Sequence, residues 1–157
     1  MKLEDQVITI EQGMRLNKLG IIQKSLFYHI QDKTPTNPNL HHYGCQQAKM
    51  QFRITHGQQS ILSGANIHFE FSAFTVSELG EMLPYRLRDA EKNENPHLRI
   101  YRGENEWSVE YHQTFSRPYV QLGDHKNLAE AMGYILIHLL ENDLTTIEEV
   151  NQRLLSK

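Results

Sequence analysis

The chain has 157 residues, of which 39% are hydrophobic, and a formal net charge of -3 from 16 Lys and Arg against 19 Asp and Glu. This length suits one domain, so we expect a single α+β domain over residues 1–157. The acidic balance argues against a protein that binds nucleic acid mainly through phosphate contacts, which needs a basic excess. The single Cys45 excludes an internal disulfide and a metal site of several thiolates. One free thiol is in keeping with a reducing compartment.

The apolar segments are too short to span a membrane. Glu4 and Asp5 stand where a signal peptide would have its apolar core. The longest apolar-rich run covers residues 132–140 and is far shorter than the roughly 20 residues that cross a bilayer. These features predict a cytoplasmic protein without membrane contact.

The N-terminal part predicts a helix followed by strands. Thr9 and Gln12 have the spacing of a capping box, and Gly20 suits the left-handed residue that ends a helix. Strands are expected at residues 25–30, 48–54 and 60–62. Between the first two strands, residues 31–44 are rich in Pro and Asn and have no periodicity, which predicts a long surface loop.

Residues 66–84 predict a junction between a strand and a short helix. Ile67, Phe69 and Phe71 alternate with polar residues at the period of a strand. Thr75 and Glu78 then have capping-box spacing, and Pro84 closes the segment.

The C-terminal part predicts a loop, a hairpin, a third strand and two helices. The loop is expected at residues 85–97, and the strands at 98–102, 107–111 and 118–122, with Gly103 at the hairpin turn. Asp124 or Asn127 can cap the first helix. The last helix can begin at Thr145 with Glu148, or at Thr146 with Glu149. The order of elements favours an α+β fold with a largely antiparallel sheet of about five strands, an N-terminal helix, a short central helix and two C-terminal helices.

His41, His42 and Cys45 form the sequence H-H-x-x-C in the expected loop. Imidazole and thiolate are good zinc ligands, so a metal-dependent protein or a hydrolase built on Cys45 is one interpretation. The other His residues are scattered singly, whereas structural zinc sites use four ligands in close pairs. We therefore favour a polar loop over a metal site, and no cofactor is expected because phosphate-binding glycine motifs are absent from the sequence.

Aromatic and basic residues interleave over residues 98–119. The residues concerned are Tyr101, Trp107, Tyr111, Phe115 and Tyr119 with Arg99, Arg102 and Arg117. On one sheet face they could stack the bases of a single-stranded nucleic acid. The same residues at period two also serve as cross-strand pairs, and Glu104, Glu106 and Glu110 favour that structural interpretation.

Two segments resemble a family of small bacterial proteins associated with prophage-like and other mobile genetic regions. They are residues 11–28, EQGMRLNKLGIIQKSLFY, and residues 73–83, AFTVSELGEML, where the family pattern reads T-x-S-E-L-G-x-M-L-P. Residues 135–142 match a final I-x-L-x-E-N helix end loosely, and the matches cover under half the chain. The resemblance implies a small accessory protein rather than a metabolic enzyme, and it implies no catalytic residue.

The leading interpretation is a non-enzymatic domain of phage or mobile-element origin that acts on a protein partner. This interpretation is based on two observations: the sequence has clear capping boxes and strand periodicity, and it has no recognisable catalytic motif. The alternatives are a metal-dependent protein or hydrolase that uses the His41, His42 and Cys45 loop, and a single-strand binder that uses residues 98–119.

Overall fold

The computed structural model describes residues 6–32, 51–56, 67–87, 95–113 and 118–156. Within these residues the chain forms four helices and six strands. In chain order they are α1 (Ile10–Lys18), β1 (Phe27–Asp32), β2 (Gln51–His56), β3 (Ile67–Ser72), α2 (Val76–Met82), β4 (His97–Arg102), β5 (Trp107–His112), β6 (Pro118–His125), α3 (Leu128–Glu141) and α4 (Ile147–Leu155). All strand pairs are antiparallel, so the expected α+β class is confirmed.

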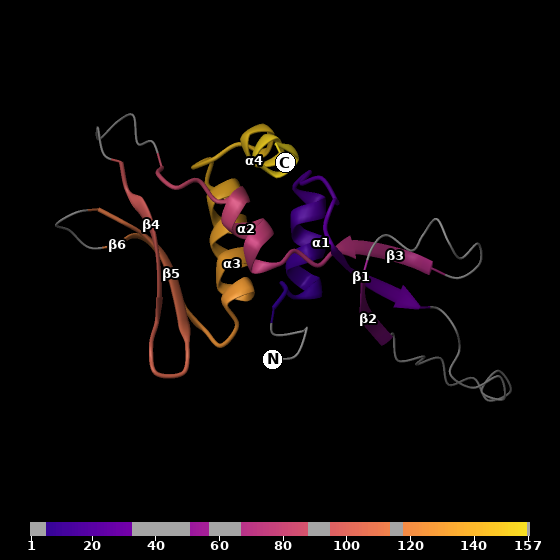
Figure 1. Cartoon of the computed structure of the whole chain (residues 1–157). Coiled ribbons are helices and arrows are strands. Elements are labelled where there is room, and N and C mark those ends of the chain that lie inside the picture. Colours follow the sequence, from indigo (N-terminus) through magenta and orange to yellow (C-terminus); the bar gives the residue numbers. More distant parts are fainter. Residues whose placement is uncertain (1–5, 33–50, 57–66, 88–94, 114–117, 157) are drawn as a thin grey trace, which may run out of the picture.

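The strands form two three-stranded sheets rather than one sheet. Their orders are β2-β1-β3 and β4-β5-β6, and the helices lie between the two sheets (Figure 1). The sheets bury different surfaces: β3 contacts α1, whereas β5 and β6 contact α3. Each sheet therefore has its own helix to cover it, and the two sheets share no strand.

Helix α3 is the centre of the packing. Nine of its 14 residues are buried, and it contacts α1, α2, β5 and β6. A helix that is apolar on nearly every side must be covered on every side. The main core cluster combines α3 with apolar side chains of the other three helices and of β5 and β6.

The helix starts follow the expected capping residues. Capping boxes are present at Thr9 with Gln12, at Thr75 with Glu78, and at Thr146 with Glu149. Asn127 caps α3, which settles that choice against Asp124. Gly20 has φ of 93° after α1, as expected for the left-handed residue at a helix end.

Several boundaries differ from expectation. Strand β1 continues to Asp32 and β2 continues to His56, each two residues beyond its expected end, because the two strands pair from Phe27 with His56 to Asp32 with Gln51. Residues 48–50 of the expected second strand lie outside the described residues. Residues 85–87, expected as loop, contact β4 through a bridge between Arg86 and His97. The expected strand at 60–62 and most of the expected loop at 31–44 lie outside the described residues.

Glu78 joins α2 to the segment that enters β1. Its buried carboxylate accepts hydrogen bonds from the backbone N–H and the hydroxyl of Thr75, at 2.7 and 2.8 Å. It also accepts from the Ser25 hydroxyl at 3.0 Å and from the Leu26 N–H at 3.1 Å. One side chain thus begins a helix and ties a distant segment to it.

Replacing Glu78 tests this double role. In Glu78→Gln an amide N–H₂ replaces one oxygen and faces hydrogen-bond donors, so we expect a loss of roughly 1–3 kcal/mol in the free energy of unfolding. Glu104→Gln changes the same charge at an exposed position, in the turn between β4 and β5, and should stay within about 0.5 kcal/mol of the parent. Urea unfolding measures both. Equal effects of the two substitutions would contradict the role assigned to Glu78.

His29 on β1 is a buried titratable group. Its Nε2 lies 2.9 Å from the backbone oxygen of Ile8, and because a carbonyl can only accept, Nε2 carries the proton. Burial lowers the pKa of His29 below 6.5, and the hydrogen bond to Ile8 opposes this in part. The folded protein therefore keeps this imidazole neutral at a pH where the unfolded chain takes up a proton.

The sign of the pH effect follows from this difference. Above pH 6.5 the imidazole is neutral in both states, and below it the unfolded chain binds the proton first, so stability falls as the pH drops. We expect the free energy of unfolding to be lower at pH 5 than at pH 7.5. The difference should shrink in His29→Gln, which keeps a side-chain N–H but cannot titrate. An unchanged difference in that variant would show that other groups cause the pH dependence.

Candidate interaction surface

The residues expected to bind a metal, His41, His42 and Cys45, lie outside the described part of the chain, so the metal site stays a prediction. Among the residues that the structure describes, no group of three or more His, Cys, Asp or Glu side chains is placed to hold a metal ion. The candidate surface is instead the β4–β5 hairpin, which combines exposed aromatic, aliphatic and charged side chains.

The hairpin register divides its side chains between two faces. Leu98 pairs with Tyr111 and Ile100 with Val109, and these pairs belong to the face that packs toward the core. Arg99 pairs with Glu110 and Tyr101 with Ser108 on the opposite face. Directly paired residues in an antiparallel ladder share a face. We call the side chains of Arg99, Tyr101 and Glu110 the polar face.

The aromatic residues expected over 98–119 do not share one face. Tyr111 is fully buried in the core, and Tyr119 packs partly against it. Trp107 lies under the Arg102 guanidinium at 5.6 Å, on the core-side face, while Tyr101 belongs to the polar face. Phe115 and Arg117 lie outside the described residues. The described aromatic side chains are thus divided in the way that suits sheet packing better than a row of stacked bases.

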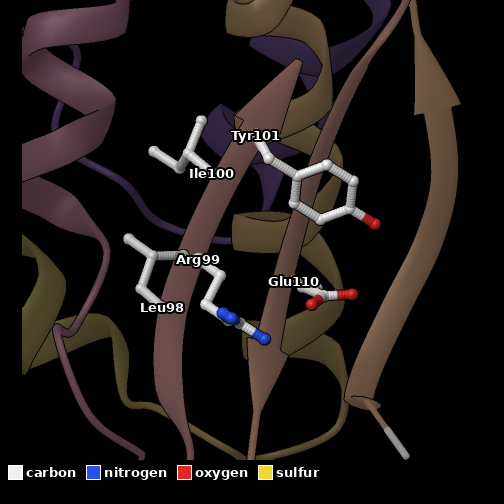
Figure 2. A pocket seen from close by; sticks show the side chains of 5 residues that line it. All are labelled: Leu98, Arg99, Ile100, Tyr101 and Glu110. Carbon is white, nitrogen blue, oxygen red and sulfur yellow. The ribbon is translucent and has the colours of Figure 1, made fainter. Parts of the chain in front are cut away.

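The polar face borders an open groove of about 650 Å³, lined by Leu98, Arg99, Ile100, Tyr101 and Glu110. Figure 2 shows Arg99, Tyr101 and Glu110 on one side of the sheet and Leu98 and Ile100 on the other. A second hollow of about 360 Å³ lies at the hairpin turn between Tyr101 and Glu106. Tyr101 borders both hollows and is the central side chain of this surface.

Glu110 is a charged group at the middle of the sheet. It is only 5% exposed, on the central strand, with Arg99 paired on one side and Gln121 on the other. A carboxylate in this position can accept hydrogen bonds from a donor that enters the groove. The polar face can therefore recognise polar or cationic groups beside the aromatic ring of Tyr101.

Strand β4 lies at the edge of its sheet, and only the first half of that edge is covered. The backbone N–H of Leu87 donates to the backbone oxygen of Pro96 at 2.9 Å, and the N–H of Leu98 donates to the backbone oxygen of Tyr85 at 3.0 Å. Beyond Leu98, no described backbone group pairs with β4 on this side. We call residues 100–102 the open edge.

The side chains around the open edge are large and apolar or cationic. Ile100 is 43% exposed, Tyr101 46% and Tyr85 69%. Arg86, Arg99 and Arg102 are exposed among them, and the turn that follows carries the exposed Glu104 and Glu106. The surface is thus basic along the strand and acidic at the turn.

The segment that leads into the covering residues 85–87 is held by hydrogen bonds from β5 and α4. The Tyr111 hydroxyl donates to the backbone oxygen of Pro84, and Arg153 of α4 donates to that of Met82 at 3.1 Å. Burial raises the pKa of Tyr111, while the charge of Arg153 opposes the shift. The phenol therefore stays protonated and remains a donor to Pro84.

Sequence reasoning located the hairpin but missed its open edge. The bridge between Arg86 and His97 joins two parts of the segment 85–97, which was expected to be a loop. One signal was present: Ile100 and Tyr101 are adjacent, so one large apolar side chain lies on each face of the same strand.

In the described part of the chain, no helix is long and apolar enough to cross a membrane. Comparisons of the chain with protein-family models, with curated protein sequences and with solved structures gave no match.

Two tyrosines of the hairpin should respond differently to loss of the hydroxyl. Tyr111→Phe leaves the buried Pro84 oxygen without its donor, so we expect a loss of roughly 1–3 kcal/mol in the free energy of unfolding. Tyr101→Phe makes the same change at a half-exposed position and should stay within about 0.5 kcal/mol of the parent. Urea unfolding compares them. A neutral Tyr111→Phe would mean that the bond to Pro84 does not hold residues 85–87.

Proposed function

We propose that this chain is a non-enzymatic protein-interaction domain that binds its partner with the polar face and the open edge of β4. The observation that carries the proposal is the exposure of Ile100 and Tyr101 on the half of β4 that no described residue covers, beside the exposed Tyr85 of the covering segment. Three exposed arginines, Arg86, Arg99 and Arg102, surround them. Tyr and Arg are enriched at the energetic centres of protein interfaces. An uncovered strand also offers backbone groups that a partner can pair with.

The packing behind the surface supports the same role. The strand next to the open edge, β5, contacts α3, and the covering residues are held by Tyr111 and Arg153. A surface fixed by the core binds without first having to be ordered, which reduces the entropic cost of association.

The resemblance to small bacterial proteins of prophage-like regions supports an accessory role of phage or mobile-element origin. We also propose a cytoplasmic location, because a single thiol, Cys45, suits a reducing compartment. Its partner in this proposal is another protein, and nucleic acid is not expected because Glu104, Glu106 and Glu110 lie within the hairpin.

Site-specific photo-crosslinking in the native cells tests the proposal. With Tyr101 replaced by p-benzoylphenylalanine, we expect a discrete adduct of higher mass on denaturing gels. The same replacement at Gln152, exposed on α4, is the matched control and should give no such adduct. Adding Arg99→Glu to the Tyr101 variant should weaken the adduct, because it reverses the charge beside the crosslinker.

Two results would overturn the proposal. One is the absence of any adduct at position 101, or the same adducts at positions 101 and 152. The other is turnover of a small-molecule substrate that Glu110→Gln abolishes while the fold is retained, which would make the groove a catalytic site.

A further inference from the structure

We propose that the open edge of β4 pairs with the open edge of a second copy of this chain, in an antiparallel arrangement with a two-fold axis at Tyr101. This inference deepens the proposed function, on which it rests, by naming one partner of the surface. It joins the two β4-β5-β6 sheets into one sheet of six strands.

Two residues of the open edge direct their backbone N–H and C=O groups away from β5, where a second strand could pair with them. In an antiparallel ladder, successive residues direct their N–H and C=O groups to opposite sides of the strand. The N–H of Leu98 faces Tyr85, on the side away from β5. The backbone groups of Ile100 and Arg102 therefore face that same side, and those of Tyr101 face β5.

With a two-fold axis at Tyr101, every outward backbone N–H and C=O group of Ile100 and Arg102 gains a partner. It places Ile100 opposite Arg102 of the second copy, and Arg102 opposite Ile100 of the second copy. Each pair then exchanges two hydrogen bonds, and the two Tyr101 residues form the pair between them that exchanges none. The side chains of such a pair lie close together, so the two exposed Tyr101 rings can pack against each other on the polar face.

The ends of the open edge fit the same arrangement. At one end residues 85–87 occupy the side of β4. At the other end the chain turns away at Gly103, whose N–H donates to the backbone oxygen of Glu106 at 2.8 Å. With the axis at Tyr101, the turn of each copy starts where the covering residues of the other copy end. A long extended peptide would instead run into Tyr85.

The charges are complementary at the two ends of this pairing, whereas the two Arg102 residues near its centre lie two positions apart along the strands, each over its own Trp107 ring. The edge is basic at Arg86 and Arg99 and acidic at Glu104 and Glu106. An antiparallel two-fold pairing brings the acidic turn of each copy to the basic end of the other. The two Arg99 residues lie four positions apart along the strands, roughly 13 Å, which exceeds the screening length of about 8 Å at physiological salt.

The main helix contacts of this sheet are made by the other two strands, since α3 packs on β5 and β6. Three paired residues a side make a small interface, so we expect a weak dimer that forms at high micromolar concentration rather than an obligate one.

Analytical ultracentrifugation over a concentration series tests the pairing. The parent should move from a mass of 18.4 kDa toward twice that value as concentration rises. Ile100→Pro removes the outward N–H without removing a bond to β5, and should weaken dimerisation at least tenfold. Ile100→Val is the matched control, since it keeps the N–H, and should dimerise within about threefold of the parent.

A disulfide trap tests the register. Paired residues that exchange no hydrogen bonds have Cα atoms about 4.5 Å apart, which a disulfide can bridge. In a Cys45→Ser background, Tyr101→Cys should oxidise to a covalent dimer much faster than Gln152→Cys on the exposed face of α4. Charge reversal adds a further check: Arg99→Glu should weaken the dimer, and Arg99→Glu with Glu104→Arg should restore it.

The inference is overturned if the parent is a monomer at all concentrations, if Ile100→Pro dimerises like Ile100→Val, or if both cysteine variants oxidise equally fast. Photo-crosslinking at position 101 separates this failure from that of the proposed function. An adduct with a different protein and none with a second copy would overturn the inference and leave the proposed function standing. No adduct of either kind would overturn both.

Discussion

The need to cover α3 on nearly every side governs this structure. A helix with nine buried residues cannot lie on the surface of a sheet with its other side in water, because each large apolar side chain left exposed would forgo roughly 1.5–3 kcal/mol. Sheet β4-β5-β6 covers one side, and α1 and α2 cover others. The close approach to α1 is possible because position 133 is Gly: a Cβ there would lie 2.9 Å from Ile8 Cγ2 and 3.0 Å from Gln12 Nε2. The Gln12 side-chain amide in turn donates to the backbone oxygen of Glu130 at 2.8 Å, so this close crossing also satisfies a buried polar group.

The sequence predicted the features that depend on neighbouring residues. Capping boxes join residues three apart, and the hairpin of β4 and β5 needs a short turn only, so both are visible as local patterns. The division into two sheets was not predicted, because the pairing of β1 with both β2 and β3 joins strands separated by long segments. Alternation shows that a strand has an apolar face but does not show which helix will cover it.

The candidate surface was predicted only in part for the same reason. The aromatic and basic residues of 98–119 were recognised, and period two with the register would already have placed Tyr101 and Tyr111 on opposite faces. What no local pattern contains is that residues 85–87 cover half of one strand and leave the other half open. An edge is defined by what is absent from a strand's side, and that depends on the path of the whole chain.

The carboxylate of Glu78 also has a consequence for the order of events in folding. Its bonds to Thr75 close a loop of three residues, whereas its bonds to Ser25 and Leu26 link positions more than 50 residues apart. Local contacts close in well under a microsecond, and distant ones wait for the chain to collapse. We therefore expect the start of α2 to form early and to present an acceptor with two lone-pair sites still unused. The segment that enters β1 then binds, through Ser25 and Leu26, to a carboxylate that is already held in position by Thr75. The start of α2 would thus form first and provide the site to which the start of β1 attaches.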